Sequence, residues 1–181
     1  ERMSPEAPVP IVDIIKLESR LGGAANCALN VKSLGANPIL CTVVGNDNNG
    51  VKFEELMKES SLSTEGMLVC SDRKTTVKTR VISEGKQQLR LDEEDKHPIK
   101  IEKQFLNNFK ELLNNTDVII LQDYNKGVLT KKIISELILI SKNKGIPTIV
   151  DPKNDNFLEY KGVDIVKPNL KEIKYGMKIE F

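Results

Sequence analysis

The stretch DVIILQDYNKG, residues 117–127, changes from apolar to polar within a single residue. Its first half is short and rich in Ile and Val, which is typical of a strand buried on both faces. Its second half holds carboxylate, amide and ammonium groups followed by a glycine, the composition of a loop. The stretch therefore predicts a buried strand whose carboxyl end opens directly onto reactive polar side chains.

The same pattern occurs three more times along the chain. Apolar strands are expected at 38–44, 146–150 and 163–166, and they are followed at once by GNDNNG, DPK and KPNLKE. Helical patterns alternate with these strands, over 24–34, 51–60, 101–113 and 129–142, and a last helix begins after Pro168. Apolar strands separated by amphipathic helices predict an α/β fold with a mostly parallel sheet covered on both faces.

The middle of the chain and its beginning differ from this alternation. Residues 66–92 have no helical period and predict two strands joined around Glu84-Gly85-Lys86, a β-hairpin with polar and apolar positions alternating. So many polar side chains suggest one wet face, or a face that lies over a ligand. Residues 8–15 predict another strand.

Composition excludes several classes of protein. The 181 residues suit one domain, and the net charge of +1 gives no basis for capturing nucleic acid or a membrane surface. No apolar run is long enough to span a bilayer. The cysteines, Cys27, Cys41 and Cys70, lie in apolar surroundings and are expected to be free thiols in a reducing cytoplasm. A single histidine makes a zinc site of the usual kind unlikely to be present.

The four polar loops after the strands point to phosphoryl transfer. Ligands of open α/β sheets bind beyond the carboxyl ends of the strands. Carboxylates beside Lys126 and Lys153 at that edge suit a metal-bound polyphosphate and a phosphorylated partner. Neither G-x-x-x-x-G-K-[ST] nor G-x-G-x-x-G occurs, which excludes a P-loop enzyme and counts against a dinucleotide site. The alternative is that these Asp and Asn residues only form turns and cap helices, as we expect for Asp47.

These motifs resemble the ribokinase-like (PfkB) carbohydrate kinases, and within them the heptose-phosphate kinases. The matching segments cover nearly the whole chain and are SPEAPVP (4–10), GGAAN (22–26), SLGAN (33–37), VGNDNNG (44–50), QQLRLDEED (87–95), DYNKGVL (123–129), DPK (151–153) and KPNLKE (167–172). The resemblance implies a three-layer sandwich with a mostly parallel central sheet plus a small β-lid. It makes residues 1–181 a single partial kinase domain, with an α/β core at 16–65 and 93–181 and a lid at 1–15 and 66–92.

The resemblance also implies a role for each matching residue. The sugar substrate would be held by Gly22, Gly23, Asn26, Arg90, Asp123 and Lys126. The glycines would let the sugar approach the backbone, and Arg90 would reach the phosphate from the hairpin. ATP and Mg²⁺ would lie beside Asp151, Lys153, Asn169, Leu170, Lys171 and Glu172, with Glu172 at the metal.

Local explanations compete with three of these roles. The small residues at 22–25 could serve close packing, and Asn26 could bond within its own helical turn. Glu172 could be the N3 residue of a capping box that begins at Asn169. Arg90 could form a cross-strand charge pair on the hairpin.

The activity implied is ATP-dependent phosphorylation of D-glycero-β-D-manno-heptose 7-phosphate at O1, for lipopolysaccharide core synthesis, by a homodimer joined through the lid. Alternatives are another sugar substrate, or a non-catalytic module that binds sugar phosphate or dimerises. The family's catalytic base lies in a G-A-G-D motif, which does not occur in these residues, and both ends of the chain look cut. We therefore expect a fragment that does not turn over alone.

Overall fold

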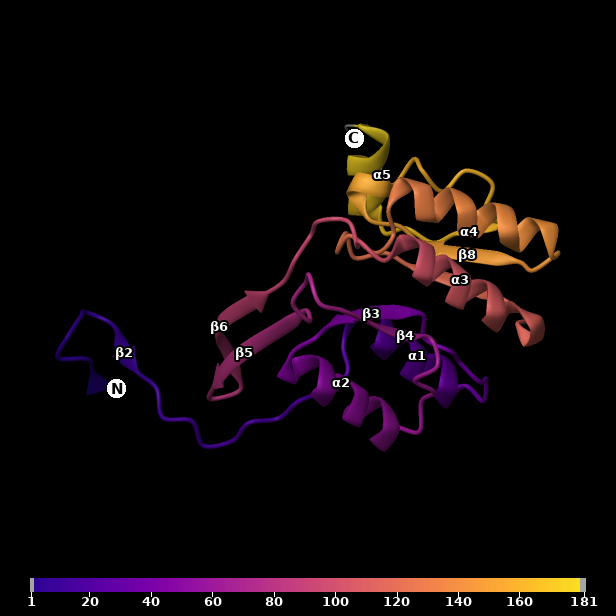
Figure 1. The fold of residues 1–181 in the computed structure, drawn as a ribbon. Coiled ribbons are helices and arrows are strands. Elements are labelled where there is room, and N and C mark those ends of the chain that lie inside the picture. Colours follow the sequence, from indigo (N-terminus) through magenta and orange to yellow (C-terminus); the bar gives the residue numbers. More distant parts are fainter. Residues whose placement is uncertain (1, 180–181) are drawn as a thin grey trace.

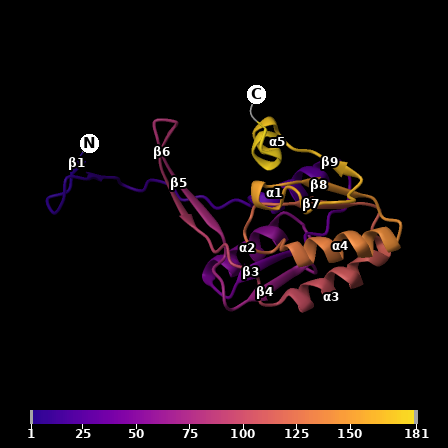
Figure 2. The same ribbon diagram turned by 90° about the horizontal axis from the view of Figure 1, so that it is seen from above.

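The computed structural model describes residues 2–179, and Figure 1 shows their path. A body of helices and parallel strands carries the residues from Leu21 onward, and a β-hairpin and an N-terminal arm project from it. The same projection is seen from above in Figure 2. None of the helices in residues 2–179 is long and apolar enough to cross a membrane.

The predicted α/β class is confirmed, with parallel strands in two groups. β3 (Thr42–Gly45) pairs with β4 (Met67–Cys70), and β8 (Thr148–Asp151) pairs with both β7 (Ile119–Gln122) and β9 (Ile165–Val166). All three pairings are parallel. Among the described residues β3 and β7 do not pair with each other, so the sheet is interrupted between them.

The helices lie close to their predicted positions. They are α1 (Gly23–Ser33), α2 (Asn48–Glu59), α3 (Glu102–Leu112), α4 (Lys131–Asn143) and α5 (Leu170–Met177), with short 3₁₀ turns at Leu113–Asn115 and Asn154–Asn156. Three begin at a side-chain cap: Asp47 accepts from the N–H of Gly50, and Thr130 from that of Ile133. Such caps satisfy backbone donors that a helix leaves unpaired, so the polar residues after β3 and before α4 fix where these helices start.

Two apolar clusters hold the body together. The larger joins α3 and α4 to β7 and β8 and includes the fully buried Ile133, Ile134 and Val150. The smaller packs α1 on α2 through Ala25, Ala28 and Met57. Because α1 contributes mainly alanines, it can lie close to its neighbours. Packing thus accounts for part of the small-residue run at 22–28.

The predicted hairpin is confirmed. β5 (Val77–Ser83) and β6 (Lys86–Glu93) run antiparallel around a two-residue turn. Glu84 and Gly85 both have positive φ, 51° and 73°, which matches the twist that two-residue hairpins require. Register places Lys78 opposite Asp92 and Arg80 opposite Arg90, and these pairs share one face of the ribbon. The other face carries apolar residues such as Val81 and Leu89.

Two strand predictions were wrong in extent. The strand expected at 8–15 is only β2 (Pro10–Ile11), which pairs with β1 (Arg2–Met3). Pro8 and Pro10 lack the N–H that a ladder needs, which limits pairing at this point. Conversely, the sequence did not predict β4, whose residues lie in a segment assigned to the hairpin region. β4 belongs beside β3 in the body.

Candidate functional site

A cavity of about 1000 Å³ separates β3 from β7 at the interruption of the sheet. Residues of β3, β7, α1 and α3 line it, together with the loop that follows β7. Four of the predicted sugar-site residues reach it: Gly22, Gly23, Asp123 and Lys126. The carboxyl end of β7 and the start of α1 therefore meet at one cavity, as the strand-exit pattern predicts.

The two glycines at the start of α1 have different surroundings. Gly23 has a φ of 55°, a left-handed conformation that disfavours side chains. A Cβ there would lie 3.6 Å from the ring of Tyr124. A Cβ on Gly22 would meet no atom within 4 Å. Gly23 thus serves backbone geometry and the contact with Tyr124, whereas Gly22 leaves open space beside the cavity.

Asp123 is buried and its carboxylate is fully engaged inside the protein. One oxygen accepts from the N–H of Asn125 at 2.8 Å. The other accepts from the hydroxyl of Tyr160 at 2.7 Å and the amide of Asn156 at 2.9 Å. Burial and the Asp123 charge raise the pKa of Tyr160, so the phenol stays a donor. In this structure Asp123 fixes the loop after β7 to the segment that follows β8.

Lys126 forms an ion pair with Glu94, at the end of the hairpin, with 2.5 Å between Nζ and Oε2. Both side chains are largely buried, 21% and 14% exposed. The hydrogen bond from Lys126 is the main cause that lowers the pKa of Glu94 from 4.5 to about 2. A bond from Lys78 adds to it, and partial burial opposes it. Lys126 is therefore held charged at the cavity.

The low pKa of Glu94 predicts a pH-dependent contribution to stability. A carboxyl whose folded pKa is lower than its unfolded pKa stabilises the fold above the unfolded value. The contribution of Glu94 should be complete above about pH 5 and decline as the pH falls from about 4.5 to 2. Urea denaturation of wild type and Glu94→Gln should give midpoints that differ at pH 7 and converge near pH 2. A difference that stays constant across this range would contradict the assignment.

A second polar cluster lies at the ends of β8 and β9. Lys153 donates to Oε1 of Glu172 at 2.8 Å, and Lys167 lies 3.4 Å from Asp151. Asp151 also accepts from Gln122 at 2.6 Å. Since the N–H of Asp123 donates to the carbonyl of Asp151, this cluster adjoins the cavity loop. Four of the residues expected near ATP are thus close together, counting Asn169, which follows.

Asn169 and Glu172 form a capping box, so the local alternative for Glu172 is confirmed. Asn169 accepts from the N–H of Glu172 at 3.0 Å, and Glu172 accepts from that of Asn169 at 2.8 Å. Burial alone would raise the pKa of Glu172, but the Asn169 hydrogen bond and the Lys153 ammonium outweigh it and lower the pKa. The box orients the Glu172 carboxylate toward Lys153.

Removal of this cap should cost stability in a way that depends on the substituted side chain. Asn169→Ala should lower the free energy of unfolding by about 1 kcal/mol, because α5 loses its capping oxygen. Asn169→Asp keeps a capping oxygen and should stay within about 0.5 kcal/mol of wild type. Chemical denaturation of both variants measures the difference. Equal losses would show that the amide nitrogen, not the cap, stabilises this region.

The remaining predicted residues lie apart from the cavity wall. Asn26 is exposed on α1 and is not among the cavity-lining residues, and its side chain makes no hydrogen bond within residues 2–179. Arg90 binds Asp92 on its own strand, with Nε 2.9 Å from Oδ1. Its residue directly across the ladder is Arg80, so Arg90 forms no charge pair with the residue opposite. Leu170 and Lys171 are exposed on the first turn of α5.

No group of three or more His, Cys, Asp or Glu side chains suited to a metal exists among the described residues. Mg²⁺ is commonly held by one or two carboxylates plus substrate phosphates. Glu172 and Asp151 could supply such carboxylates, since each occupied oxygen keeps a further lone pair. The chain thus fits a magnesium ion carried mainly by a nucleotide.

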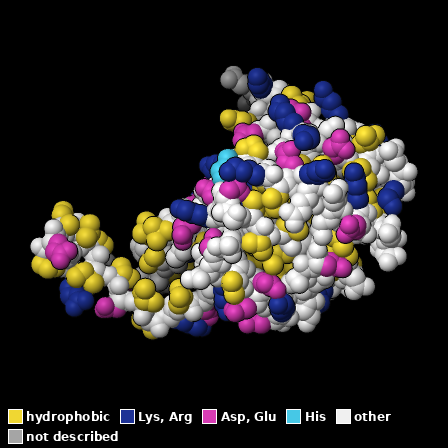
Figure 3. Space-filling view, viewed as in Figure 1, with side chains coloured by type: hydrophobic (Ala, Val, Ile, Leu, Met, Phe, Trp, Pro, Cys, Tyr) yellow, Lys and Arg dark blue, Asp and Glu magenta, His cyan; other side chains and the backbone are white. Residues whose placement is uncertain are grey.

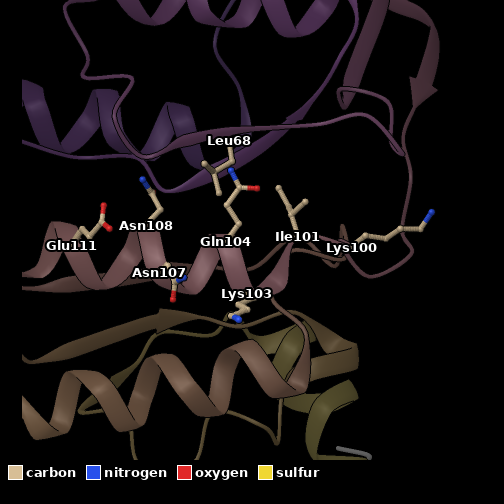
Figure 4. Close-up of a pocket in the computed structure, with 8 residues that line it drawn as sticks. All are labelled: Leu68, Lys100, Ile101, Lys103, Gln104, Asn107, Asn108 and Glu111. Carbon is tan, nitrogen blue, oxygen red and sulfur yellow. The ribbon is translucent and has the colours of Figure 1, made fainter.

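A separate hollow of about 570 Å³ lies along α3 (Figure 4). Leu68 from β4 and polar side chains of α3, including Gln104 and Asn108, surround it. Asn108 donates to the carbonyl of Glu65 at 3.1 Å, so part of this surface joins α3 to the loop before β4. It lies away from the strand ends, and none of the predicted site residues lines it.

Sequence reasoning missed three residues that shape the cavity: Arg73, Glu94 and Tyr124. Tyr124 lies within the quoted DYNKG loop, and Glu94 within QQLRLDEED, so each was visible in a motif without a role. Arg73 stands in no quoted motif. Its burial, 7% exposed, is unusual for arginine and becomes visible only in the folded chain.

The cavity and its strand-end loops have the arrangement of a ribokinase-like kinase, and solved structures of that class share the fold. A possible 1-phosphofructokinase from Thermotoga maritima matches with a TM-score of 0.70 and 18% identity, over 99% of this chain and 59% of that one. Phosphofructokinase-2 from Escherichia coli matches with a TM-score of 0.68 and 18% identity, over 88% and 53%.

A model of the pfkB family of carbohydrate kinases matches residues 3–179, and the chain belongs to this family. Curated relatives named "Bifunctional protein HldE" include those of Campylobacter jejuni subsp. doylei, 41% identical over 99% of this chain, and Helicobacter pylori strain HPAG1, 37% identical over 99%. The chain spans 38% and 39% of the length of these two relatives.

Proposed function

We propose that residues 1–181 form the central part of an ATP-dependent kinase for D-glycero-β-D-manno-heptose 7-phosphate. The observation that carries this proposal is the cavity that brings Lys126, in the DYNKG loop, next to the glycines of GGAAN. Both motifs are those on which the resemblance to heptose kinases rests. The relatives named HldE, at 36–41% identity, support the same assignment.

In the proposed reaction, O1 of the sugar attacks the γ-phosphorus of ATP. The new bond joins O1 to phosphorus, the bond to the β-phosphate oxygen breaks, and ADP leaves with 1,7-bisphosphate as the sugar product. We propose that the O1 proton passes to the G-A-G-D base that the family resemblance places after Phe181. The 181-residue chain alone is then expected to bind ligand without turnover.

The described residues would contribute charge and position to this step. Gly22 leaves room for the sugar, and the Lys126 ammonium neutralises a phosphate at the cavity. Lys153, held by Glu172, would lie at the ATP phosphates, and Glu172 would face the magnesium ion. When bound, Mg²⁺ would shield the charge of the transferred phosphoryl group.

We further propose that the hairpin and arm form a lid through which two copies dimerise in the cytoplasm. Both segments carry apolar side chains on the surface, as Figure 3 shows, including Ile14, Ile15 and Leu17 at 80% exposure or more. Exposed apolar surface of this kind marks an interaction site. Light scattering of the complete protein tests the dimer.

The activity is tested by measuring ADP release from the complete protein with heptose 7-phosphate and with unphosphorylated sugars. Phosphorus NMR of the product should show a new phosphate at O1. A clear preference for an unphosphorylated hexose would refute the heptose assignment and keep a sugar kinase. Sugar-phosphate binding without ADP release would instead identify a non-catalytic module.

A further inference from the structure

Arg73 joins three segments that are far apart in the sequence. It lies between β4 and β5, and its Nη2 donates to the carbonyl of Asp95, after β6, at 3.2 Å. The same nitrogen donates to the carbonyl of Lys126, in the loop after β7. The residue is 7% exposed. A buried guanidinium bonded to two carbonyls fixes the backbone segments that carry them.

Neighbouring contacts hold the same segments together. The N–H of Lys74 donates to the Asp95 carboxylate at 2.7 Å, and the N–H of Ile99 donates to the carbonyl of Gly127 at 3.0 Å. Gly127 passes so close to His97 that a Cβ would lie 1.9 Å from its carbonyl oxygen. Figure 3 shows charged side chains gathered where the hairpin meets the body. Both strands of the hairpin are thus anchored at the loop that carries Lys126.

The hairpin base is also attached to the exit of β3. The hydroxyl of Thr75 accepts from the N–H of Gly45 at 2.8 Å, and the N–H of Thr75 donates to Asp47 at 2.8 Å. Any bending of the hairpin must therefore occur beyond Thr75. The segment from Arg73 to Thr75 acts as part of the rigid body.

One face of the hairpin brings positive charge to the cavity. Lys78 and Arg80 of β5 line the cavity with Lys126. Lys78 is neutralised by Asp92 and Glu94, and Arg90 by Asp92. Within residues 2–179 Arg80 has neither a hydrogen bond nor an ion pair, and it lies opposite another arginine. Like charges across a ladder are unfavourable unless an anion compensates them.

We propose that Arg73 is a positioning residue that holds the hairpin base at a fixed distance from Lys126. At that distance Arg80 on the hairpin and Lys126 on the loop bind the phosphate group of a phosphorylated sugar from two sides. This inference rests on the proposed function and deepens it, since it explains selection of a sugar that already carries a phosphate. Arg73 itself does not touch the substrate.

The test compares Arg73→Ala, Arg73→Lys and Arg80→Gln in the complete kinase, with heptose 7-phosphate and unphosphorylated heptose as substrates. Arg73→Ala should raise KM for the phosphorylated sugar at least about tenfold, because small displacements of a binding group cost rate steeply. KM for ATP and kcat/KM for the unphosphorylated sugar should stay unchanged. Arg73→Lys keeps the charge without the planar fork and should show a smaller rise.

Lys74→Ala is the matched control, because Lys74 is the exposed neighbour of Arg73 and should have wild-type kinetics. If Arg73→Ala does not fold, Arg73→Lys and Arg80→Gln carry the test. Equal losses with both sugars, or an unchanged KM in every Arg73 variant, would overturn the positioning role. A wild-type enzyme without preference for the phosphorylated sugar would overturn the proposed function instead.

Discussion

Replacement of Lys126 with alanine in the complete kinase should reduce kcat/KM for the sugar phosphate about 1000-fold. The ammonium lies at the cavity and is kept in place by Glu94, so its loss removes a preorganised charge. Folding should change little, because Glu94 keeps Lys78 at 3.0 Å and Lys96 at 3.3 Å. Steady-state kinetics and thermal unfolding of the same preparation give both quantities.

Lys96→Ala provides the control for this variant. Lys96 also pairs with Glu94, but its side chain is 70% exposed and does not line the cavity. Exposed ion pairs contribute about 0–1 kcal/mol, so Lys96→Ala should leave activity and stability near wild type. If Lys126→Ala unfolds at a much lower temperature while Lys96→Ala does not, Lys126 is a structural residue and the binding role is wrong.

Gly127→Ala should be among the most destabilising single substitutions in the chain. Gly127 has a φ of 75°, and a Cβ would lie 1.9 Å from the carbonyl oxygen of His97. Left-handed backbone costs about 1–2 kcal/mol for an L-residue, and the clash with a backbone atom adds displacement of the hairpin base. A total loss of about 4 kcal/mol is expected, measured by chemical denaturation.

Gly85→Ala separates these two causes. Gly85 has nearly the same φ, 73°, but a Cβ there would meet no atom within 4 Å. It should therefore show only the conformational cost of about 1 kcal/mol. If both variants lose the same free energy, the approach of Gly127 to His97 has no energetic weight.

Much of the fold could be predicted from the sequence because its signals are local. The alternation of apolar runs with helical stripes placed all five helices, and Glu84-Gly85 identified the hairpin turn. β4 was missed because its four residues, Met67–Cys70, have no flanking signal that distinguishes them from the hairpin. Its assignment depends on pairing with β3, which is a contact across the fold.

The candidate site divides in the same way. Asn169 and Glu172 are three residues apart, so their capping box could be anticipated. The pair of Glu94 with Lys126 spans 32 residues and the bond of Arg73 to Lys126 spans 53. Such partners are chosen by tertiary packing, and no spacing in the chain indicates them.

The interruption of the sheet has a consequence for how this chain behaves in solution. Within the described residues β3 bonds only to β4 and β7 only to β8, so each leaves a row of backbone N–H and C=O groups without a strand partner. The two rows border one apolar cavity, and such edges are templates for adding extended peptide. The 181-residue chain therefore carries an acceptor for a foreign β-strand. Its solubility depends on whether that acceptor is filled.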